Sequence, residues 1–396
     1  MKRRIGVVTV GRSDYGIYYP LLRAIENDPD CELCLIVGGS HLSPYHGNTV
    51  SEIERDGFEI KARVPMLLAG DSPQSISMSI GLGVTNFAAA YESVHPDIIV
   101  LLGDRFEMLA AAVAAVPLQI PLAHIHGGEL TQGAIDDAMR HSITKLSHLH
   151  FAAAPEYGRR IEQMGEEPYR ITVTGSPVID AILSEKALSE KELNVTLGMT
   201  VRGALLVTYH PVTLEPEHIE ERIAMLLDAL EHFENELIFT YPNADTNNAV
   251  IVEQLRTFVS RHDRAHLFVN LGRKKYHSLQ RYVGAMIGNS SSGIIEAASF
   301  RLPVVNIGDR QEGRLRTPNI LDAPEEATAI QAATRKALSP EFKSSLAKME
   351  SPYGKGDASV KILQTLKKTP LDNKLLKKKF CDWGRIDTAQ VGAGAS

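Results

Sequence analysis

The sequence predicts an α/β protein built from two parallel-sheet domains that face each other across a cleft. Short apolar segments alternate with longer amphipathic segments, which is typical of parallel strands covered by helices on both faces. The alternation pauses near residue 180 and restarts at residue 204. At 396 residues the chain also exceeds what one hydrophobic core usually supports, so we expect two domains.

The first predicted domain covers residues 1–180. The spacing and length of its apolar segments separate strands from helices. Strands are expected at 5–10, 32–37, 97–102, 121–126 and 170–173, and helices at 18–27, 49–56, 106–116, 135–149 and 155–164. Gly175 and Pro177 follow the last of these strands and predict a hinge between the domains.

The second predicted domain covers residues 181–352 and repeats the same alternation. Strands are expected at 204–208, 237–241, 267–270, 285–288 and 303–307, and helices at 216–233, 248–262, 276–282 and 293–300. From residue 371 the composition becomes basic and then rich in small residues, so 371–396 is predicted to be a flexible tail. Ligands of open α/β sheets bind at the carboxyl ends of the strands, which here would line the cleft.

Composition excludes several classes of function. The net charge of -6, from 42 basic and 48 acidic residues, gives no electrostatic reason to expect a nucleic-acid partner. The most apolar region, 108–124, is interrupted by Pro117 and Pro121 and is shorter than the roughly 20 residues of a membrane-spanning helix. Three cysteines with a single C-x-x-C pair, Cys31 and Cys34, predict structural thiols and a reducing cytoplasm.

A polar turn, Gly288-Asn-Ser-Ser-Ser-Gly293, lies between a predicted strand and helix. Such a turn presents unpaired backbone N–H groups, hydroxyls and the positive end of the helix dipole, which suit a diphosphate. The alternative is that Ser291 or Ser292 only caps the helix. Glu296 follows one turn later, where it would accept two ribose hydroxyls or simply face solvent. Three arginines in 308–316 add groups that suit phosphate oxygens.

Charged residues follow the strands of the first domain. Asp104 and Arg105 follow one strand, and His124-Ile-His126-Gly-Gly-Glu129 ends the next. His124 and His126 would share one face of a strand, so a zinc site with Glu129 is an alternative to metal-free proton chemistry. The metal-free interpretation is favoured because no zinc motif such as H-E-x-x-H is present. Similarly, the first turn lacks G-x-G-x-x-G, which disfavours NAD.

Seven segments occur in order from residue 11 to residue 316: GRSDYG, GDRFE, HIHGGE with a later Asp-Asp pair, VTYHP, YPNAD, GNSSSG and GDRQEGR. Together they resemble the hydrolysing UDP-N-acetylglucosamine 2-epimerases of the sialic and legionaminic acid pathways. The resemblance implies a GT-B-like architecture of two Rossmann-like domains with an interdomain cleft. It also implies a C-terminal helix, at about residues 353–370, that crosses back to the first domain.

The resemblance further implies a set of site residues without a cofactor or metal. Arg12, His210, Asn243, Ser290, Ser291, Glu296 and Arg310 would hold UDP, and Asp104, Arg105, His126, Glu129 and Asp136 or Asp137 would line the sugar. Asp104, Glu129, Asp136 and His210 are the candidate catalytic residues. His126 stands where the non-hydrolysing relatives carry a glutamate, which favours the hydrolysing branch and leaves open whether Glu129 or His126 is the partner acid or base.

The implied reaction removes the C2 proton while UDP leaves C1, and water then adds to the resulting glycal. The expected products are N-acetylmannosamine and UDP, made by a homodimer or homotetramer. One alternative substrate is a UDP-linked 2,4-diacetamido-6-deoxy sugar, the legionaminic acid precursor. More distant alternatives are a GT-B glycosyltransferase, which would need an acceptor before releasing UDP, and a non-catalytic nucleotide-sugar sensor.

Overall fold

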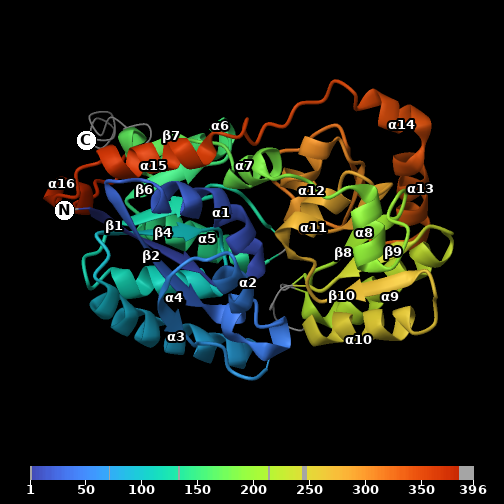
Figure 1. Cartoon of the computed structure of the whole chain (residues 1–396), viewed down its shortest axis with the longest axis horizontal. Helices are drawn as coiled ribbons and strands as arrows, with labels where there is room; N and C mark the ends of the chain where they lie inside the picture. The colour runs from blue at the N-terminus through green and yellow to red at the C-terminus, as the bar shows by residue number, and fades with distance from the viewer. Residues whose placement is uncertain (1, 71, 133, 213–214, 243–247, 383–396) are drawn as a thin grey trace, which may run out of the picture.

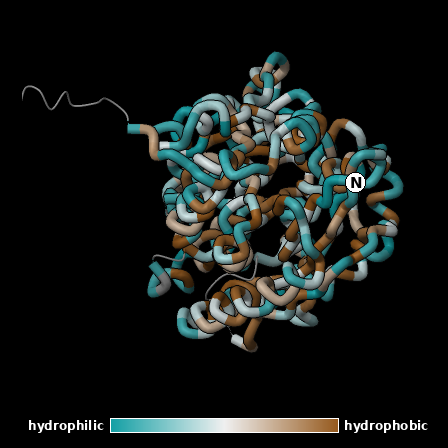
Figure 2. The backbone as a smooth tube through the Cα atoms, turned by 90° about the vertical axis from the view of Figure 1, so that its left-hand side faces the viewer, coloured by the Kyte–Doolittle hydropathy of each residue, from teal (hydrophilic) through white to brown (hydrophobic). Residues whose placement is uncertain are grey.

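The computed structural model describes residues 2–70, 72–132, 134–212, 215–242 and 248–382. Two parallel sheets, one in each lobe, form the framework (Figure 1). Viewed from the side, apolar segments concentrate toward the interior and hydrophilic loops lie at the edges (Figure 2). No helix in the described part of the chain combines the length and apolar character needed to cross a membrane.

The first sheet has seven parallel strands in the order β3-β2-β1-β4-β5-β6-β7. Buried aliphatic side chains run almost without interruption along its central strands, as expected when helices cover both faces. The strands are β1 (Arg3–Thr9), β2 (Cys31–Gly38), β3 (Ile60–Val64), β4 (Ile98–Leu102), β5 (Leu122–Ile125), β6 (Leu149–Ala152) and β7 (Ile171–Val173).

The helices of this lobe connect successive strands. They are α1 (Arg12–Glu26), α2 (Val50–Arg55), α3 (Pro73–Val94), α4 (Phe106–Ala115), α5 (Asp136–Leu146) and α6 (Pro155–Gln163). Two further helices, α7 (Pro177–Ser184) and α8 (Glu190–Leu197), lead into the second lobe. The strand order reverses between β1 and β4, so the loops after these two strands border the crevice where α/β sheets bind ligands.

The second sheet has six parallel strands in the order β10-β9-β8-β11-β12-β13. They are β8 (Leu205–Thr208), β9 (Leu237–Thr240), β10 (Ala265–Phe268), β11 (Ala285–Gly288), β12 (Val304–Ile307) and β13 (Ile320–Ala323). The helices are α9 (Ile219–Glu231), α10 (Asn248–Val259), α11 (Gly272–Leu279), α12 (Ser291–Ile295), α13 (Ala327–Leu338) and α14 (Pro340–Ser345). The chain reversal here lies between β8 and β11, which places the serine turn at this sheet's crevice.

Several predicted elements differ from the observed ones. Helix α1 begins at Arg12 rather than at residue 18. The carboxylate of Asp14 accepts hydrogen bonds from Thr9 Oγ1 and Val10 N, and these bonds hold the residues that follow Gly11 in the first turn of the helix. The helix predicted to end at 149 ends at Leu146, and strand β6 follows it. The four residues of β6, Leu149-His-Phe-Ala152, are too few for periodicity to separate a strand from a helix. Strands β3 and β13 and helices α3, α13 and α14 are also absent from the predicted set.

The C-terminal part of the chain returns to the first lobe (Figure 1). Helix α15 (Ala358–Lys368) packs against α1 and α7, and both carboxylate oxygens of Asp180 accept hydrogen bonds from its first backbone amides, at 3.1 and 2.6 Å. Within the segment predicted to be a flexible tail, a short helix α16 (Asn373–Leu376) buries Leu375 against the first lobe. Residues 383–396 lie outside the described residues.

Candidate active site

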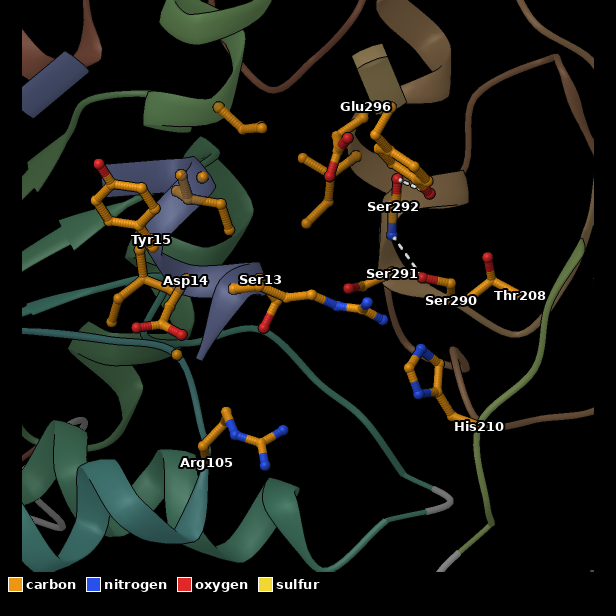
Figure 3. Close-up of a pocket in the computed structure, with 18 of the residues that line it drawn as sticks. Ser13, Asp14, Tyr15, Arg105, Thr208, His210, Ser290, Ser291, Ser292 and Glu296 are labelled. Atoms are coloured by element: carbon orange, nitrogen blue, oxygen red, sulfur yellow. Dashed lines mark hydrogen bonds between the residues drawn. The ribbon is translucent and has the colours of Figure 1, made fainter. Parts of the chain in front are cut away.

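A cavity of about 250 Å³ lies between the two lobes. Figure 3 shows Ser13, Asp14, Tyr15 and Arg105 of the first lobe facing His210 and Ser290–Ser292 of the second. Every predicted site residue that the structure describes lines this cavity: Arg12, Asp104, Arg105, His126, Glu129, Asp136, His210, Ser290, Ser291, Glu296 and Arg310. The remaining one, Asn243, lies outside the described residues.

The serine turn follows β11 closely because Gly288 allows two strands to approach. Gly288 has a φ of +133°, and a Cβ at this position would lie 1.9 Å from the carbonyl oxygen of Thr208 on β8. Ser290 caps α12 by accepting a hydrogen bond from Ser292 N, so the capping residue is Ser290 rather than Ser291 or Ser292. The hydroxyl of Ser291 has no protein partner among the described residues, which leaves it available to a ligand in the cavity.

Asn289 joins the serine turn to its neighbours. Its side chain exchanges two hydrogen bonds with the backbone of His210, at 2.7 and 2.9 Å, and fixes the chain from which the imidazole of His210 projects. The backbone carbonyl oxygen of Asn289 accepts hydrogen bonds from Arg310 Nη1 at 3.1 Å and from Gln311 Nε2 at 2.9 Å. Asn289 is fully buried, so these bonds are shielded from water and form a rigid support.

Glu296 ends α12 at the edge of the cavity. Its Oε2 accepts a hydrogen bond from Gln280 Nε2 at 3.2 Å and lies 3.4 Å from His277 Nε2. His277 lies between Glu296 and Glu185, whose Oε2 is 3.8 Å from Nδ1. Burial by itself lowers the pKa of His277, but the two neighbouring carboxylates outweigh burial and raise the pKa above its ordinary value. In its protonated form His277 is placed to orient the Glu296 carboxylate.

The acids of the first lobe form a compact network that we term the carboxylate–arginine cluster, made of Asp104, His126, Glu129, Arg140 and Arg314. Arg140 pairs with both Asp104 and Glu129, with an Nη1–Oε2 distance of 3.1 Å to the latter. Glu129 also lies 2.7 Å from His126 Nδ1 and 2.6 Å from Arg314 Nη1. Glu129 is 1 % exposed. Burial raises its pKa, but the charges of Arg314 and His126 outweigh burial and keep the pKa below its ordinary value.

His126 adopts a backbone conformation that non-glycine residues seldom take, with a φ of +65°. Its Nε2 contacts Ser176 Oγ at 2.9 Å, and this contact leaves Nδ1 directed at Glu129. Gly128 follows with a φ of +77°, and a Cβ there would lie 2.4 Å from the Tyr157 carbonyl oxygen. The His-Gly-Gly turn is thus folded back on α6, and this fold directs both His126 and Glu129 into the cavity.

The two neighbouring aspartates of α5 separate in the structure. Asp136 lines the cavity, whereas the Oδ1 of Asp137 accepts a hydrogen bond from Thr131 N at 2.6 Å and its Oδ2 lies 3.4 Å from His141. Because Asp136 lines the cavity and Asp137 does not, Asp136 is the better candidate for contact with a ligand there.

The alternative zinc site does not form around His124. This histidine is fully buried, with its ring nitrogens 2.8 Å from the Gly103 carbonyl oxygen and 3.1 Å from Thr144 Oγ1. Burial lowers its pKa to about 3, so His124 is a neutral core residue. Across the described ranges, no group of three or more His, Cys, Asp or Glu side chains is arranged to hold a metal ion.

Two predicted arginines have protein partners in the cavity. The guanidinium of Arg12 crosses the cleft and donates to the carbonyl oxygens of Val269 and, at 2.7 Å, Tyr241. Arg105 makes a two-bond contact with the buried Glu107, at 3.1 and 3.3 Å. Both side chains line the cavity, and both are held in place before a ligand arrives.

Sequence reasoning left several cavity residues out of the predicted site. Arg140 and Arg314 hold the acids, and Tyr276 donates a hydrogen bond to Ser292 Oγ at 2.9 Å. The three arginines of 308–316 indicated a phosphate site, but in the structure each of them has a different partner. Arg310 reaches the serine turn, Arg314 reaches Glu129, and Arg316 pairs instead with Asp322 at 3.1 Å.

Comparisons with known proteins identify the family of this chain. A family model described as UDP-N-acetylglucosamine 2-epimerase matches residues 23–367. The GDP/UDP-N,N'-diacetylbacillosamine 2-epimerase (hydrolyzing) of Campylobacter jejuni is 44% identical over 385 residues, covering 96% of this chain and 99% of that protein. The UDP-N,N'-diacetylbacillosamine 2-epimerase (hydrolyzing) of Legionella pneumophila is 38% identical over 380 residues, covering 96% and 99%.

The fold is similarly matched among solved structures. The UDP-GlcNAc 2-epimerase of Neisseria meningitidis, solved bound to UDP-GlcNAc, superposes with a TM-score of 0.79 at 19% identity, covering 93% of this chain and all of that one. The two parallel-sheet domains are therefore arranged as in the GT-B-like fold of these structures, as predicted.

Proposed function

Because the chain belongs to the UDP-N-acetylglucosamine 2-epimerase family and is an enzyme of its hydrolysing type that acts on a UDP-sugar, we propose that its substrate is UDP-N,N'-diacetylbacillosamine. The products would be UDP and the free 2,4-diacetamido-2,4,6-trideoxy sugar with inverted C2. The two diacetylbacillosamine epimerases, at 44% and 38% identity, support this substrate. This substrate is the alternative that the sequence analysis named, and we now favour it over UDP-N-acetylglucosamine.

One observation carries the proposal. The serine turn of the second sheet and the acids at the strand ends of the first sheet face each other across a single cavity. A UDP-sugar has a diphosphate at one end of its reacting bond and a sugar carbon that loses a proton at the other. The cavity provides backbone amides, hydroxyls and Arg310 for the first and carboxylates for the second.

The proposed reaction proceeds in two stages. A base removes the C2 proton, the electron pair forms the C1=C2 double bond, and the C1–O bond breaks with UDP taking its electrons. Water then adds its oxygen to C1 and gives one proton to a base, while an acid protonates C2 from the face opposite to the one that lost its proton. The two stages together therefore need one proton-transferring group on each face of the ring. We assign Glu129 with His126 to one face and Asp104 with Asp136 to the other.

The second-lobe side of the cavity would stabilise UDP as the leaving group. Negative charge develops on the β-phosphate as the C1–O bond breaks, and donors already held in position lower the free energy of that transition state. We propose that Ser290, Ser291, Arg310 and His210 act here, and that Glu296 binds the ribose. The support is local: Asn289 holds both Arg310 and the His210 backbone, so the donors keep their geometry during the reaction.

The test is to incubate the purified chain with UDP-N,N'-diacetylbacillosamine or UDP-N-acetylglucosamine in D2O, without an acceptor. We expect the release of UDP and of a C2-inverted free sugar that carries one deuterium at C2, both of which NMR detects. UDP-N,N'-diacetylbacillosamine should be consumed faster than UDP-N-acetylglucosamine. A requirement for an acceptor would indicate a glycosyltransferase. The absence of UDP from both donors would refute the proposal.

Variants separate binding from chemistry. Glu296→Ala and Arg310→Ala should each weaken UDP binding by about 10- to 100-fold, because each removes a charged hydrogen-bond partner. Asp104→Asn should bind UDP like the wild type and lose most of kcat. Calorimetry and initial rates measure both quantities, and equal UDP affinity in all three variants would contradict the assignment.

A further inference from the structure

The loop after β12 is anchored at its start to the nucleotide end of the cavity. Arg310 and Gln311 donate to the carbonyl oxygen of Asn289, at 3.1 and 2.9 Å, and Asn289 begins the serine turn. Arg310 and Gln311 are both buried. These bonds tie the first part of the loop to the serine turn.

The far end of the same loop crosses the cleft and docks on the first lobe. Gly313 has a φ of +80°, and a Cβ there would lie 2.5 Å from the side chain of Leu130. Arg314 Nε donates to the Leu130 carbonyl oxygen at 3.1 Å, and the amide of Leu315 donates to Tyr157 Oη at 3.0 Å. These contacts leave Arg314 Nη1 2.6 Å from Glu129 Oε2, in a pair that is almost completely buried.

We propose that Arg314 is a positioning residue that couples the serine turn to the proton-handling acids. Through one loop, a diphosphate on the turn would set the place of Arg314, and Arg314 would set the orientation and charge of Glu129. The inference rests on the proposed function for what Glu129 does. It adds a residue from the opposite domain to the proton chemistry, so the acids are complete only when the two lobes are together.

The surroundings of Glu129 explain why Arg314 matters. Arg140 is shared between Glu129 and Asp104, and its Nη2 also donates to Thr131 Oγ1 at 2.8 Å. Arg314 is therefore the cation that Glu129 receives from the second lobe. The titratable and charged groups that face Glu129 are His124, His126, Arg140, Tyr157, Arg314 and Tyr353.

The charge of Arg314 has a defined effect on ionisation. Burial raises the pKa of Glu129, and Arg314 is the largest of the charges that lower it. Without that charge the pKa of Glu129 rises, so the carboxylate form is lost at a higher pH. If Glu129 acts as a carboxylate, the acidic limb of the kcat/KM profile moves to higher pH by the same amount.

The turnover test uses Arg314→Gln, with Arg316→Gln as the matched control from the same loop, since Arg316 pairs with the exposed Asp322. For Arg314→Gln we expect kcat to fall by about 100-fold. The Kd for UDP should change by less than about threefold, because Arg310 and the serine turn remain. The acidic limb should move to higher pH, and Arg316→Gln should match the wild type in all three measurements.

Arg314→Lys tests charge against shape. It keeps the positive charge and loses the planar fork, so the acidic limb should stay close to that of the wild type while kcat is partly recovered. Equal limbs in the wild type and Arg314→Gln would overturn the proposal. A loss of UDP affinity that accounts for the whole drop in kcat/KM would also overturn it, because Arg314 would then be a ligand-binding residue.

A stability cycle tests the coupling without substrate. The melting temperatures of Arg314→Gln, Glu129→Gln and the double variant are compared with that of the wild type. We expect the double variant to lose less than the sum of the two single losses, and strictly additive losses would refute the coupling. If the wild type releases UDP from neither donor, the proposed function fails, whereas this cycle still decides whether the two residues act together.

Discussion

His277 shows how a single buried side chain can orient a predicted site residue, Glu296. It lies between Glu185 and Glu296, and the charged and polar groups facing it are Glu185, Arg273, Tyr276, Gln280 and Glu296. Its raised pKa means that the positive charge persists above the ordinary value of 6.5 and is lost as the pH rises through the raised pKa. The orientation of Glu296 should therefore weaken at alkaline pH.

We expect His277→Gln to weaken UDP binding by about 10-fold, because Glu296 loses a charged partner. The wild type should lose UDP affinity with rising pH above 6.5, and the variant should not show this dependence. Calorimetric titration from pH 6 to pH 9 measures both effects. His266→Gln, which alters the partly exposed pair between His266 on β10 and Glu236, is the control. A variant with the pH dependence of the wild type would show that His277 is not responsible.

At the scale of elements, the segment after α15 is held by a buried carboxylate. Glu166, which follows α6, lies 3.0 Å from His150 Nε2 on β6, 2.5 Å from Lys145 Nζ on α5 and 2.8 Å from Lys378 Nζ. Burial raises the pKa of Glu166, but these hydrogen bonds outweigh it and lower the pKa to about 2. His148, His150, Lys145, Arg170 and Lys378 are the titratable groups around it.

The lowered pKa gives the stability a defined pH dependence. A carboxylate with a folded pKa of about 2 and an ordinary pKa of 4.5 stabilises the folded state above pH 4.5, and this contribution is lost as the pH falls from 4.5 toward 2. Lys378→Gln should lower the free energy of unfolding at neutral pH by about 1–3 kcal/mol. It should also move the acid-unfolding midpoint to higher pH, because the pKa of Glu166 rises.

Circular dichroism during acid titration measures that midpoint. Lys377→Gln is the control because Lys377 is exposed and lies next in the chain. Coincident acid transitions of the wild type and Lys378→Gln would indicate that the C-terminal segment does not contribute to the stability of the first lobe.

At the scale of the molecule, side chains already connect the two lobes around the cavity. Arg12 reaches backbone carbonyls of the second lobe, Asn270 donates to Glu52, and Arg314 reaches Glu129. A ligand in this cavity contacts both lobes at once. Its binding free energy should therefore stabilise the whole molecule rather than one domain.

We expect UDP at about 100 times its Kd to stabilise the folded chain by about 2.7 kcal/mol. The thermal transitions of both lobes should move to higher temperature together, and Glu296→Ala should show a smaller shift at the same UDP concentration. Scanning calorimetry measures these shifts. A shift confined to one of two transitions would contradict binding between the lobes.

The assembly into a homodimer or homotetramer stays a prediction, and sedimentation velocity tests it.

The sequence by itself determined the α/β class, the approximate strands and the segments that carry the site. Apolar periodicity is local, and the carboxyl ends of parallel strands converge, so Asp104, Glu129, His210 and Ser290 could be assigned to one cleft before any coordinates. Apolar periodicity does not reveal β6, whose four residues include His150. It also places the start of α1 too late, because the hydrogen bonds of Asp14 to Thr9 and Val10 leave no mark in an apolar pattern.

Only the tertiary structure decided which partners these residues have. The choice of Asp136 over Asp137 depends on which of the two lines the cavity, and the ionisation of Glu129 depends on the charges of Arg314 and His126. The Arg314–Glu129 pair joins residues far apart in the chain and forms where the lobes meet. Burying a charge is costly unless it is paired, so the position of each buried charge depends on a partner that no local pattern of residues encodes.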